Sequence, residues 1–325
     1  MKKLLPLAAL IAACMLMLSG CQNQVKPTDP AGTEGGLVFT TGGEQGTYYR
    51  FGQVLAGKIS ETTPTKLSVT ASGGSKENIE AVQSGKAVIG FAQTDVLSYA
   101  REGTRLFDRK ADKVLVIAEL YKEQVQIITM DPNLRSVADL KGKSVSIGAA
   151  GSGVYFNAID ILGAYGLTER DISPTYQSFG DSVDALQSGK IDAAFVVAGA
   201  PTSAVSGLAA TTDIYMISLD EEHIGKLIAS SPNYSRAVIS KRTYNTSSDV
   251  TTVAVGAVLI ANADASEADV YNVISGIYNN LEAITKAHSK GAELDLQAAA
   301  GVGSAPYHPG AAKYFAEKGI TVPTN

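Results

Sequence analysis

The sequence predicts an α/β protein with two similar lobes, each a mainly parallel sheet flanked by helices. Two observations predict this fold, the composition of the 325-residue chain and an approximate internal repeat. The chain is 45% hydrophobic and 18% charged, as in an ordinary globular protein, and it is too apolar to be disordered. The length alone is compatible with two domains or with one large one, and the repeat favours two.

The repeat consists of a strand, a glycine-rich loop and a helix. Residues 37–41 read as a short strand, the glycine-rich residues 42–46 follow, and a helical pattern comes next. The same order returns with a strand at residues 144–147, a glycine-rich loop at residues 148–153 and another helical pattern. The recurrence predicts that one α/β unit occurs twice.

A second pair of segments supports the duplication. Residues 81–86 (AVQSGK) and 185–190 (ALQSGK) each read as the end of a helix, with glycine after its last turn. Each segment runs directly into an apolar strand. Strands that alternate with helices form parallel sheets covered on both faces, so two copies predict two lobes.

The remaining elements connect or complete the lobes. Residues 114–130 read as a strand that carries the chain from the first lobe to the second, and residues 250–261 read as the strand that returns it. A 3.6-residue period predicts one helix over residues 270–284, and a last helix spans residues 308–318. These assignments predict lobe 1 from residues 37–124 and 255–325, and lobe 2 from residues 125–254.

The first twenty residues read as a bacterial lipoprotein signal peptide. Two lysines precede an apolar run at residues 4–18, which is short for a membrane span, and small residues precede Cys21. Cys21 is then the lipidated first residue of the mature chain, and residues 21–36 are a flexible tether. An ordinary signal peptide cut at another position is the alternative. No other apolar run is long enough to span a membrane.

Charge and motifs exclude several classes of function. A formal net charge of −5 disfavours a nucleic-acid binder. The three histidines, His223, His288 and His308, are far apart, and no C-x-x-C occurs, so no metal site is expected. The P-loop and G-x-S-x-G patterns are absent. The sequence implies no cofactor and offers no catalytic base, so a binding protein is favoured over an enzyme.

The two glycine-rich loops are the candidate binding site. Each lies between a strand and a helix, where the first N–H groups of the helix and its positive dipole end are available to an anion. A cleft lined by both loops suits a small anion, most simply a carboxylate. The alternative is that the glycines only form tight turns. Two further residues each have two possible roles. Tyr48 contacts either the ligand or the core, and Asp181 either contacts the ligand or caps a helix.

Six motifs in order resemble a known family over nearly the whole mature chain. They are residues 41–49 (TGGEQGTYY), 71–78 (ASGGSKEN), 90–95 (GFAQTD), 148–153 (GAAGSG), 191–195 (IDAAF) with 199–201 (GAP), and 306–311 (PYHPGA). The chain resembles the TAXI-family solute-binding proteins of tripartite ATP-independent periplasmic (TRAP) transporters.

The resemblance implies a periplasmic-binding-protein-like fold of type II that closes on a small carboxylate and delivers it to a TRAP permease. The ligand would be a glutamate-like amino acid, a dicarboxylate or a 2-oxo acid. The protein would be a lipid-anchored, extracytoplasmic monomer at the bacterial membrane. A lipoprotein that senses the ligand and signals to a membrane partner is the alternative, and a periplasmic enzyme is a weaker one. By motif position, the implied ligand contacts are Gly43, Thr47, Tyr48, Ser75, Gln93, Thr94, Ser152, Gly153 and Asp181.

Two positions depart from the family pattern. Val154 stands where many relatives have threonine, so it either removes a hydroxyl from the site or faces the core. Arg50 stands where a neutral residue is expected, and it is either solvated or reaches a second acidic group on the ligand.

Overall fold

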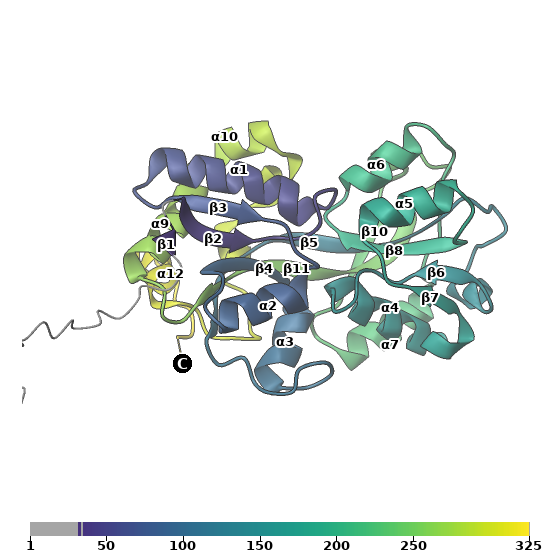
Figure 1. Ribbon diagram of the computed structural model, residues 1–325, viewed down its shortest axis with the longest axis horizontal. Helices are drawn as coiled ribbons and strands as arrows, with labels where there is room; N and C mark the ends of the chain where they lie inside the picture. The colour runs from purple at the N-terminus through teal and green to yellow at the C-terminus, as the bar shows by residue number, and fades with distance from the viewer. Residues whose placement is uncertain (1–31, 34, 325) are drawn as a thin grey trace, which may run out of the picture.

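The computed structural model of the chain describes residues 32–33 and 35–324, so the predicted signal peptide, Cys21 and most of the tether lie outside the described residues. The fold is α/β, with helices on both faces of the sheet, as the sequence predicts (Figure 1). The sheet as a whole is mixed, because antiparallel strands join the parallel sheets of the two halves. None of the helices in the described ranges is long and apolar enough to cross a lipid bilayer.

The first copy of the repeat forms the core of what we call the first half of the molecule. Its strands β2, β3 and β4 pair in parallel, with β2 in the middle. Figure 1 shows α1 on one face of this sheet and α2 and α3 on the other. The elements are β1 (Gly32–Thr33), β2 (Gly36–Thr40), α1 (Thr47–Thr62), β3 (Leu67–Thr70), α2 (Ser75–Gln83), β4 (Ile89–Gln93) and α3 (Thr94–Glu102).

The second copy forms the second half and repeats the first copy's pairing. Strand β6 is the middle strand, and β7 and β8 pair with it in parallel, as β3 and β4 pair with β2. The predicted duplication is therefore visible in the sheet. The elements are η1 (Val137–Leu140), β6 (Ser144–Ser146), α4 (Gly153–Ala164), η2 (Glu169–Asp171), β7 (Ser173–Thr175), α5 (Phe179–Gln187), β8 (Ala193–Ala198), α6 (Ser203–Ala209), β9 (Tyr215–Met216), α7 (Glu221–Ser230), β10 (Ser235–Ile239) and α8 (Lys241–Tyr244).

Two long antiparallel strands join the halves. Strand β5 (Val114–Thr129) and strand β11 (Val250–Asn262) pair with one another over residues 114–124 and 254–262, with two register irregularities. Strand β5 then continues against β8 of the second half, and β11 pairs with β4 of the first half. The result is one continuous sheet with the order β1-β2-β4-β11-β5-β8-β6-β7. The two connecting strands predicted from the sequence are confirmed.

After β11 the chain completes the first half with α9 (Glu267–Tyr278), α10 (Leu281–Ala287), η3 (Ser289–Glu293), α11 (Leu296–Ala299) and α12 (Pro309–Glu317). The single helix predicted over residues 270–284 is wrong, because α9 ends and α10 begins at Asn279–Asn280. The Asn280 Nδ2 donates to the Gly276 carbonyl oxygen at 2.8 Å, a local bond that competes with continued helix. The last helix is confirmed, with His308 as its N-cap.

The apolar core divides along the same lines. One cluster of buried side chains comes from residues 39–121 and 257–322 and also includes Phe156 of α4. Two further clusters come from residues 125–255 and 128–250. The residue boundaries of the two lobes given above stay a prediction.

Asn78 fixes the end of the first parallel sheet where the first glycine-rich loop begins. Its side chain is fully buried, and its Nδ2 donates to the carbonyl oxygens of Phe91 in β4 and Thr41 after β2. Its Oδ1 accepts from the hydroxyls of Thr40 and Ser72, each at 2.7 Å. One amide therefore ties β2, β4 and the loop before α2 together.

Asn78→Ala should lower the free energy of unfolding by about 2–4 kcal/mol, because two buried carbonyl oxygens lose their donors. Urea denaturation measures this. Asn133→Ala changes an exposed asparagine and should cost less than about 0.5 kcal/mol. Equal stability of the two variants would contradict a stabilising role for the hydrogen bonds of Asn78.

Candidate functional site

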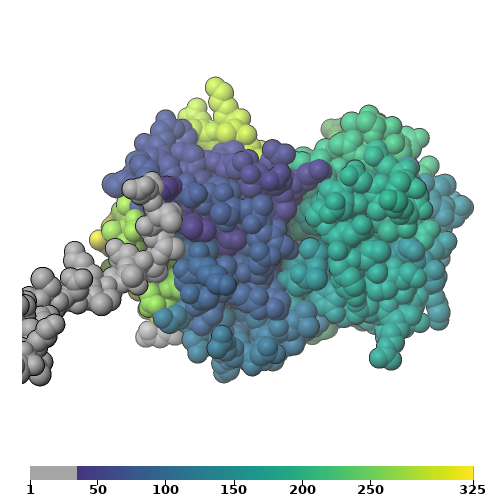
Figure 2. Space-filling model, in the orientation of Figure 1, coloured from purple at the N-terminus to yellow at the C-terminus, as the bar shows by residue number. Residues whose placement is uncertain are grey.

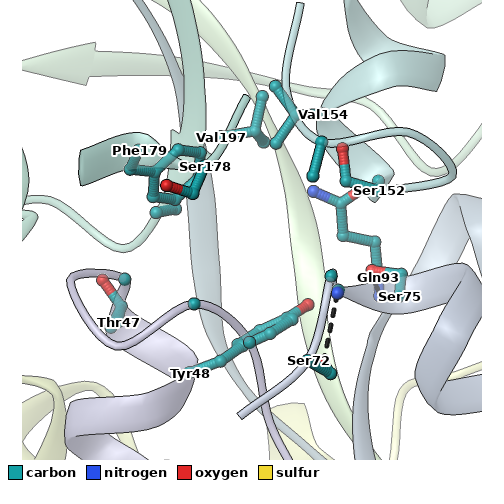
Figure 3. A pocket seen from close by; sticks show the side chains of 18 of the residues that line it. Thr47, Tyr48, Ser72, Ser75, Gln93, Ser152, Val154, Ser178, Phe179 and Val197 are labelled. Atoms are coloured by element: carbon teal, nitrogen blue, oxygen red, sulfur yellow. Dashed lines mark hydrogen bonds between the residues drawn. The ribbon is translucent and has the colours of Figure 1, made fainter. Parts of the chain in front are cut away.

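A cavity of about 110 Å³ lies between the halves, where the N-termini of four helices converge. Figure 3 shows side chains of the first half on one side of this cavity and those of the second half opposite them. Its volume suits a small metabolite rather than a drug-sized molecule, whose pockets reach roughly 300–1,000 Å³. The lining residues are Gly42, Gly43, Gly46, Thr47, Tyr48, Ser72, Gly73, Gly74, Ser75, Gln93, Glu123, Ala149, Ser152, Gly153, Val154, Gln177, Ser178, Phe179, Val197 and Ala198.

Each of the four helices has a glycine or a serine as its N-cap residue. Helices α1 and α2 have the N-caps Gly46 and Gly74, which provide no side-chain cap. Helices α4 and α5 have the N-caps Ser152 and Ser178, whose hydroxyls accept from backbone N–H groups at 3.3 and 3.2 Å. The first N–H groups of a helix lack intrahelical partners. Four positive helix ends therefore face one small space.

The first glycine-rich loop reaches across to the second half. The Thr47 hydroxyl donates to the Gly199 carbonyl oxygen at 2.8 Å, and the Gln45 carbonyl oxygen accepts from the Ala204 N–H at 3.2 Å. In Figure 2 the purple atoms of the first half extend to the teal atoms of the second half. The halves are thus in contact beside the cavity, which is the arrangement expected of a closed cleft.

Gln93 supplies a polar atom that has no partner. This last residue of β4 is 2% exposed, and its Oε1 is buried without a hydrogen-bond partner. Its backbone N–H donates to the Ser75 hydroxyl at 3.2 Å. Figure 3 shows the side chain extending from beside Ser75 toward Ser152. Because buried polar atoms are normally satisfied, an unpartnered oxygen in a cavity indicates a place for a donor from a ligand.

The close approach of Gln93 requires glycine at position 153. A Cβ on Gly153 would lie 1.9 Å from the Gln93 Oε1, far inside van der Waals contact. The glycine in the second loop therefore allows side chains from the two halves to meet, in addition to forming a turn.

The cavity holds one acidic side chain, Glu123, which the sequence analysis missed. It lies in β5 and is 2% exposed, and the Tyr48 hydroxyl donates to its Oε2 at 2.9 Å. Burial raises the pKa of Glu123 to about 8, against hydrogen bonds from Tyr48 and Gln93 that lower it. No lysine, arginine or histidine in the described part of the chain lines the cavity.

Tyr48 lines the cavity and also packs in the core, so its core role is confirmed and its contact with a ligand stays a prediction. Its hydroxyl meets Glu123 at the cavity, while its ring stacks on Phe91 in the core at 4.6 Å between centroids. Val154 likewise lines the cavity and belongs to an apolar cluster of the second half. Arg50 is exposed and does not line the cavity.

The structure brings most of the expected contact residues together. Those that line the cavity are Gly43, Thr47, Tyr48, Ser75, Gln93, Ser152 and Gly153. Thr94 lies outside the lining, and its hydroxyl oxygen accepts from the Gly256 N–H at 3.1 Å. Asp181 also lies outside it, in the first turn of α5. The alternative that Asp181 caps this helix is wrong, because the helix starts earlier and Ser178 is its cap.

The structure also adds lining residues that no glycine pattern announced. Gln177, Ser178 and Phe179 come from the start of α5, and Val197 and Ala198 from the end of β8. The serine before an amphipathic run was an available signal for the α5 start. Among the described residues, no group of histidine, cysteine, aspartate or glutamate is placed to hold a metal ion.

Comparison with known proteins identifies a family and a fold. The model of the NMT1-like family matches residues 39–319. A solved periplasmic transporter is 14% identical and covers 78% of this chain and 86% of its own, with a TM-score of 0.52. A protein from Bordetella bronchiseptica RB50 is 20% identical, with 79% and 77% covered and a TM-score of 0.51. An ancestral arginine-binding protein bound to arginine is 15% identical, with 79% and 97% covered and a TM-score of 0.50. At these identities the likeness shows the fold alone, and it confirms the predicted fold class.

Gly153→Ala should destabilise the protein by about 0.5–1.5 kcal/mol, because the added methyl group displaces the end of the buried Gln93 side chain from its position. Gly163 on the same helix is a matched control, since a Cβ there meets nothing within 4 Å. Gly163→Ala should stabilise by about 0.5–1 kcal/mol. Thermal or urea unfolding of both variants measures the difference, and a stabilising Gly153→Ala would rule out the close contact.

The unliganded protein should lose stability as the pH rises from 5 to 8. Glu123 keeps its proton to about pH 8 in the folded state but releases it near pH 4.5 when unfolded, so the folded state binds more protons in this range. Burial also raises the pKa of Asp95 to about 7, with the same sign. Glu123→Gln should reduce the dependence of the free energy of unfolding on pH, and the substitution of the exposed Glu102, Glu102→Gln, should leave this dependence unchanged. Parallel curves for wild type and Glu123→Gln in urea titrations would contradict the raised pKa.

Proposed function

The chain belongs to the NMT1-like family, and from this membership and the cavity we propose that it is an extracytoplasmic solute receptor. It captures a small carboxylate between its halves and delivers it to a membrane permease. The observation that carries the proposal is the convergence of four helix N-termini on one cavity whose described lining contains no basic side chain.

Backbone N–H groups at helix starts suit a carboxylate. They are donors held in place by the fold, and the helix dipole favours negative charge at this end. Helices α1 and α2 come from the first half, and α4 and α5 from the second. A ligand held by both pairs stabilises the closed arrangement over any open one, because it binds the closed state better. Binding of this kind reports the ligand to a partner through the closed shape.

Two of the similar solved structures agree with a binding role. One is a periplasmic transporter, and another is an arginine-binding protein bound to arginine, an amino acid with a carboxylate. Among the described residues, the cavity lining offers hydroxyls, amides and one carboxyl, without a cysteine or histidine to act as nucleophile or base. We therefore place the protein among receptors and not among enzymes.

The finer assignment follows the motif resemblance to the TAXI family. The receptor is anchored to the bacterial membrane by lipid on Cys21, with residues 21–36 as the tether, and its partner is a TRAP permease. Its ligand is a glutamate-like amino acid, a dicarboxylate or a 2-oxo acid. Thr94 and Asp181 do not line the cavity, but each lies close in the chain to a residue that does.

Small carboxylates should raise the melting temperature of the purified, ligand-free protein, whereas sugars and metal ions should not. A ligand at about 100 times its dissociation constant stabilises the folded state by about 2.7 kcal/mol, which shifts melting by several degrees. The measurement is a thermal-shift panel of amino acids, dicarboxylates and 2-oxo acids. A flat response to every carboxylate would exclude the proposed ligand class.

Gly153→Leu provides the matched test of the site, because its side chain enters the cavity beside Gln93. It should abolish the carboxylate shift, while Gly163→Leu on the exposed part of the same helix should retain it. Melting of each unliganded variant shows that it is folded. Wild-type affinity in a folded Gly153→Leu protein would place the ligand elsewhere.

A further inference from the structure

We infer that Glu123 selects the ligand, and that the cavity binds a carboxylate that also carries an ammonium group, held against Glu123. This inference rests on the proposed function and narrows its ligand class to α-amino acids. Dicarboxylates and 2-oxo acids lack the cation that Glu123 would meet.

The cavity lining combines groups that favour negative and positive charge. The starts of four helices supply positive backbone dipoles, and the carboxyl group of Glu123 supplies the opposite pole. Glu123 is held in place from one side, because the Tyr48 hydroxyl donates to its Oε2 and the Tyr48 ring is stacked on Phe91. A zwitterion has one charge for each pole, so an α-amino acid satisfies both at once.

Glu123 lacks a countercharge within the described structure. None of the ion pairs among the described residues includes it. The cation that most influences it is Lys290, whose ammonium group is already paired with Glu293 and lies 5.5 Å from the centre of the Tyr121 ring. A buried carboxylate without a cation is costly, so a ligand that brings one is favoured.

Several titratable groups surround Glu123. Tyr48 of α1 donates to it, Tyr121 precedes it in β5, Asp95 lies at the start of α3, and Lys290 with Glu293 lies in η3. Burial and the charge of Asp95 raise the pKa of Glu123, whereas Lys290 lowers it, and the result is about 8. The unliganded cavity therefore holds a protonated Glu123 at neutral pH.

Binding of an ammonium group should expel this proton. A cation beside the carboxyl group stabilises its ionised form, so the proton leaves for the buffer and an ion pair forms. A 2-oxo acid of the same length presents a carbonyl oxygen at this position. That oxygen is an acceptor and needs the protonated form of Glu123, so its binding releases no proton.

The test compares matched ligand pairs by calorimetry on the purified full chain. L-Glutamate with 2-oxoglutarate, and L-alanine with pyruvate, differ only in the ammonium or carbonyl group. The amino acid of the better-fitting pair should bind more tightly than its partner. Its affinity should rise about tenfold per pH unit up to about pH 8. Measured in two buffers of different ionisation enthalpy at pH 7, its binding should release close to one proton. The 2-oxo acid should show neither effect.

Glu123→Gln should weaken amino-acid binding by about 100-fold or more, since the ammonium group then meets a neutral amide. It should affect the 2-oxo acid far less, so the preference disappears. Glu119→Gln is the matched control, because Glu119 is on the same strand, is paired with Lys122 and does not line the cavity. It should keep the wild-type preference and proton release.

The outcomes separate the two proposals. Equal affinity for both members of each pair, or amino-acid binding without proton release, would overturn the role of Glu123 while the carboxylate receptor stands. Failure of every carboxylate to bind would overturn the receptor proposal itself. The proton count uses the wild-type protein, so it decides the question even if Glu123→Gln does not fold.

Discussion

The antiparallel pairing of β5 with β11 is the constraint on which the rest of the structure depends. These two strands belong to both halves, since β11 pairs with β4 and β5 pairs with β8. They join the two parallel sheets into one continuous sheet, and residues at or just after the ends of β2, β4, β6 and β8 line the same cavity. Ligands of open α/β sheets bind outside such strand ends, and the helices that follow begin there. The cavity, its four helix starts and the acid on β5 are consequences of this one pairing.

In the function we propose, the cavity attracts an anion through backbone geometry, since no basic side chain of the described residues lines it. Helix N-termini are fixed by the fold, so their N–H groups need little rearrangement when a carboxylate arrives. A lysine or arginine in so small a space would also add side-chain bulk and lose conformational entropy. The contacts of Thr47 and Gln45 with the second half bring both pairs of helices to the same cavity. In the inference drawn above, Glu123 adds a group that meets the ammonium of the ligand and so makes the cavity selective.

Local features made the fold and much of the site predictable. Glycines between a strand and a helix mark both loops, and their repetition reveals the duplicated unit, so the sequence places Gly43 and Gly153 on loops that line one cavity. Glu123 was not predictable in this way, because its burial depends on how β5 packs against Tyr48 of a distant helix. No glycine-rich loop precedes α5, and the sequence pattern suggested Asp181 as its cap, whereas Ser178 caps the helix. The apolar period runs across Asn279–Asn280, so it could not show where α9 ends.

The central claim is that helix N-termini of both halves hold the carboxylate of a ligand in the cavity. The most direct measurement is a crystal structure of the protein with a bound carboxylate. We expect carboxylate oxygens at about 2.7–3.1 Å from backbone nitrogens at the starts of α1 or α2 and of α4 or α5. It is contradicted by a ligand whose carboxylate pairs with a lysine or arginine outside the cavity, or whose contacts come from one half alone.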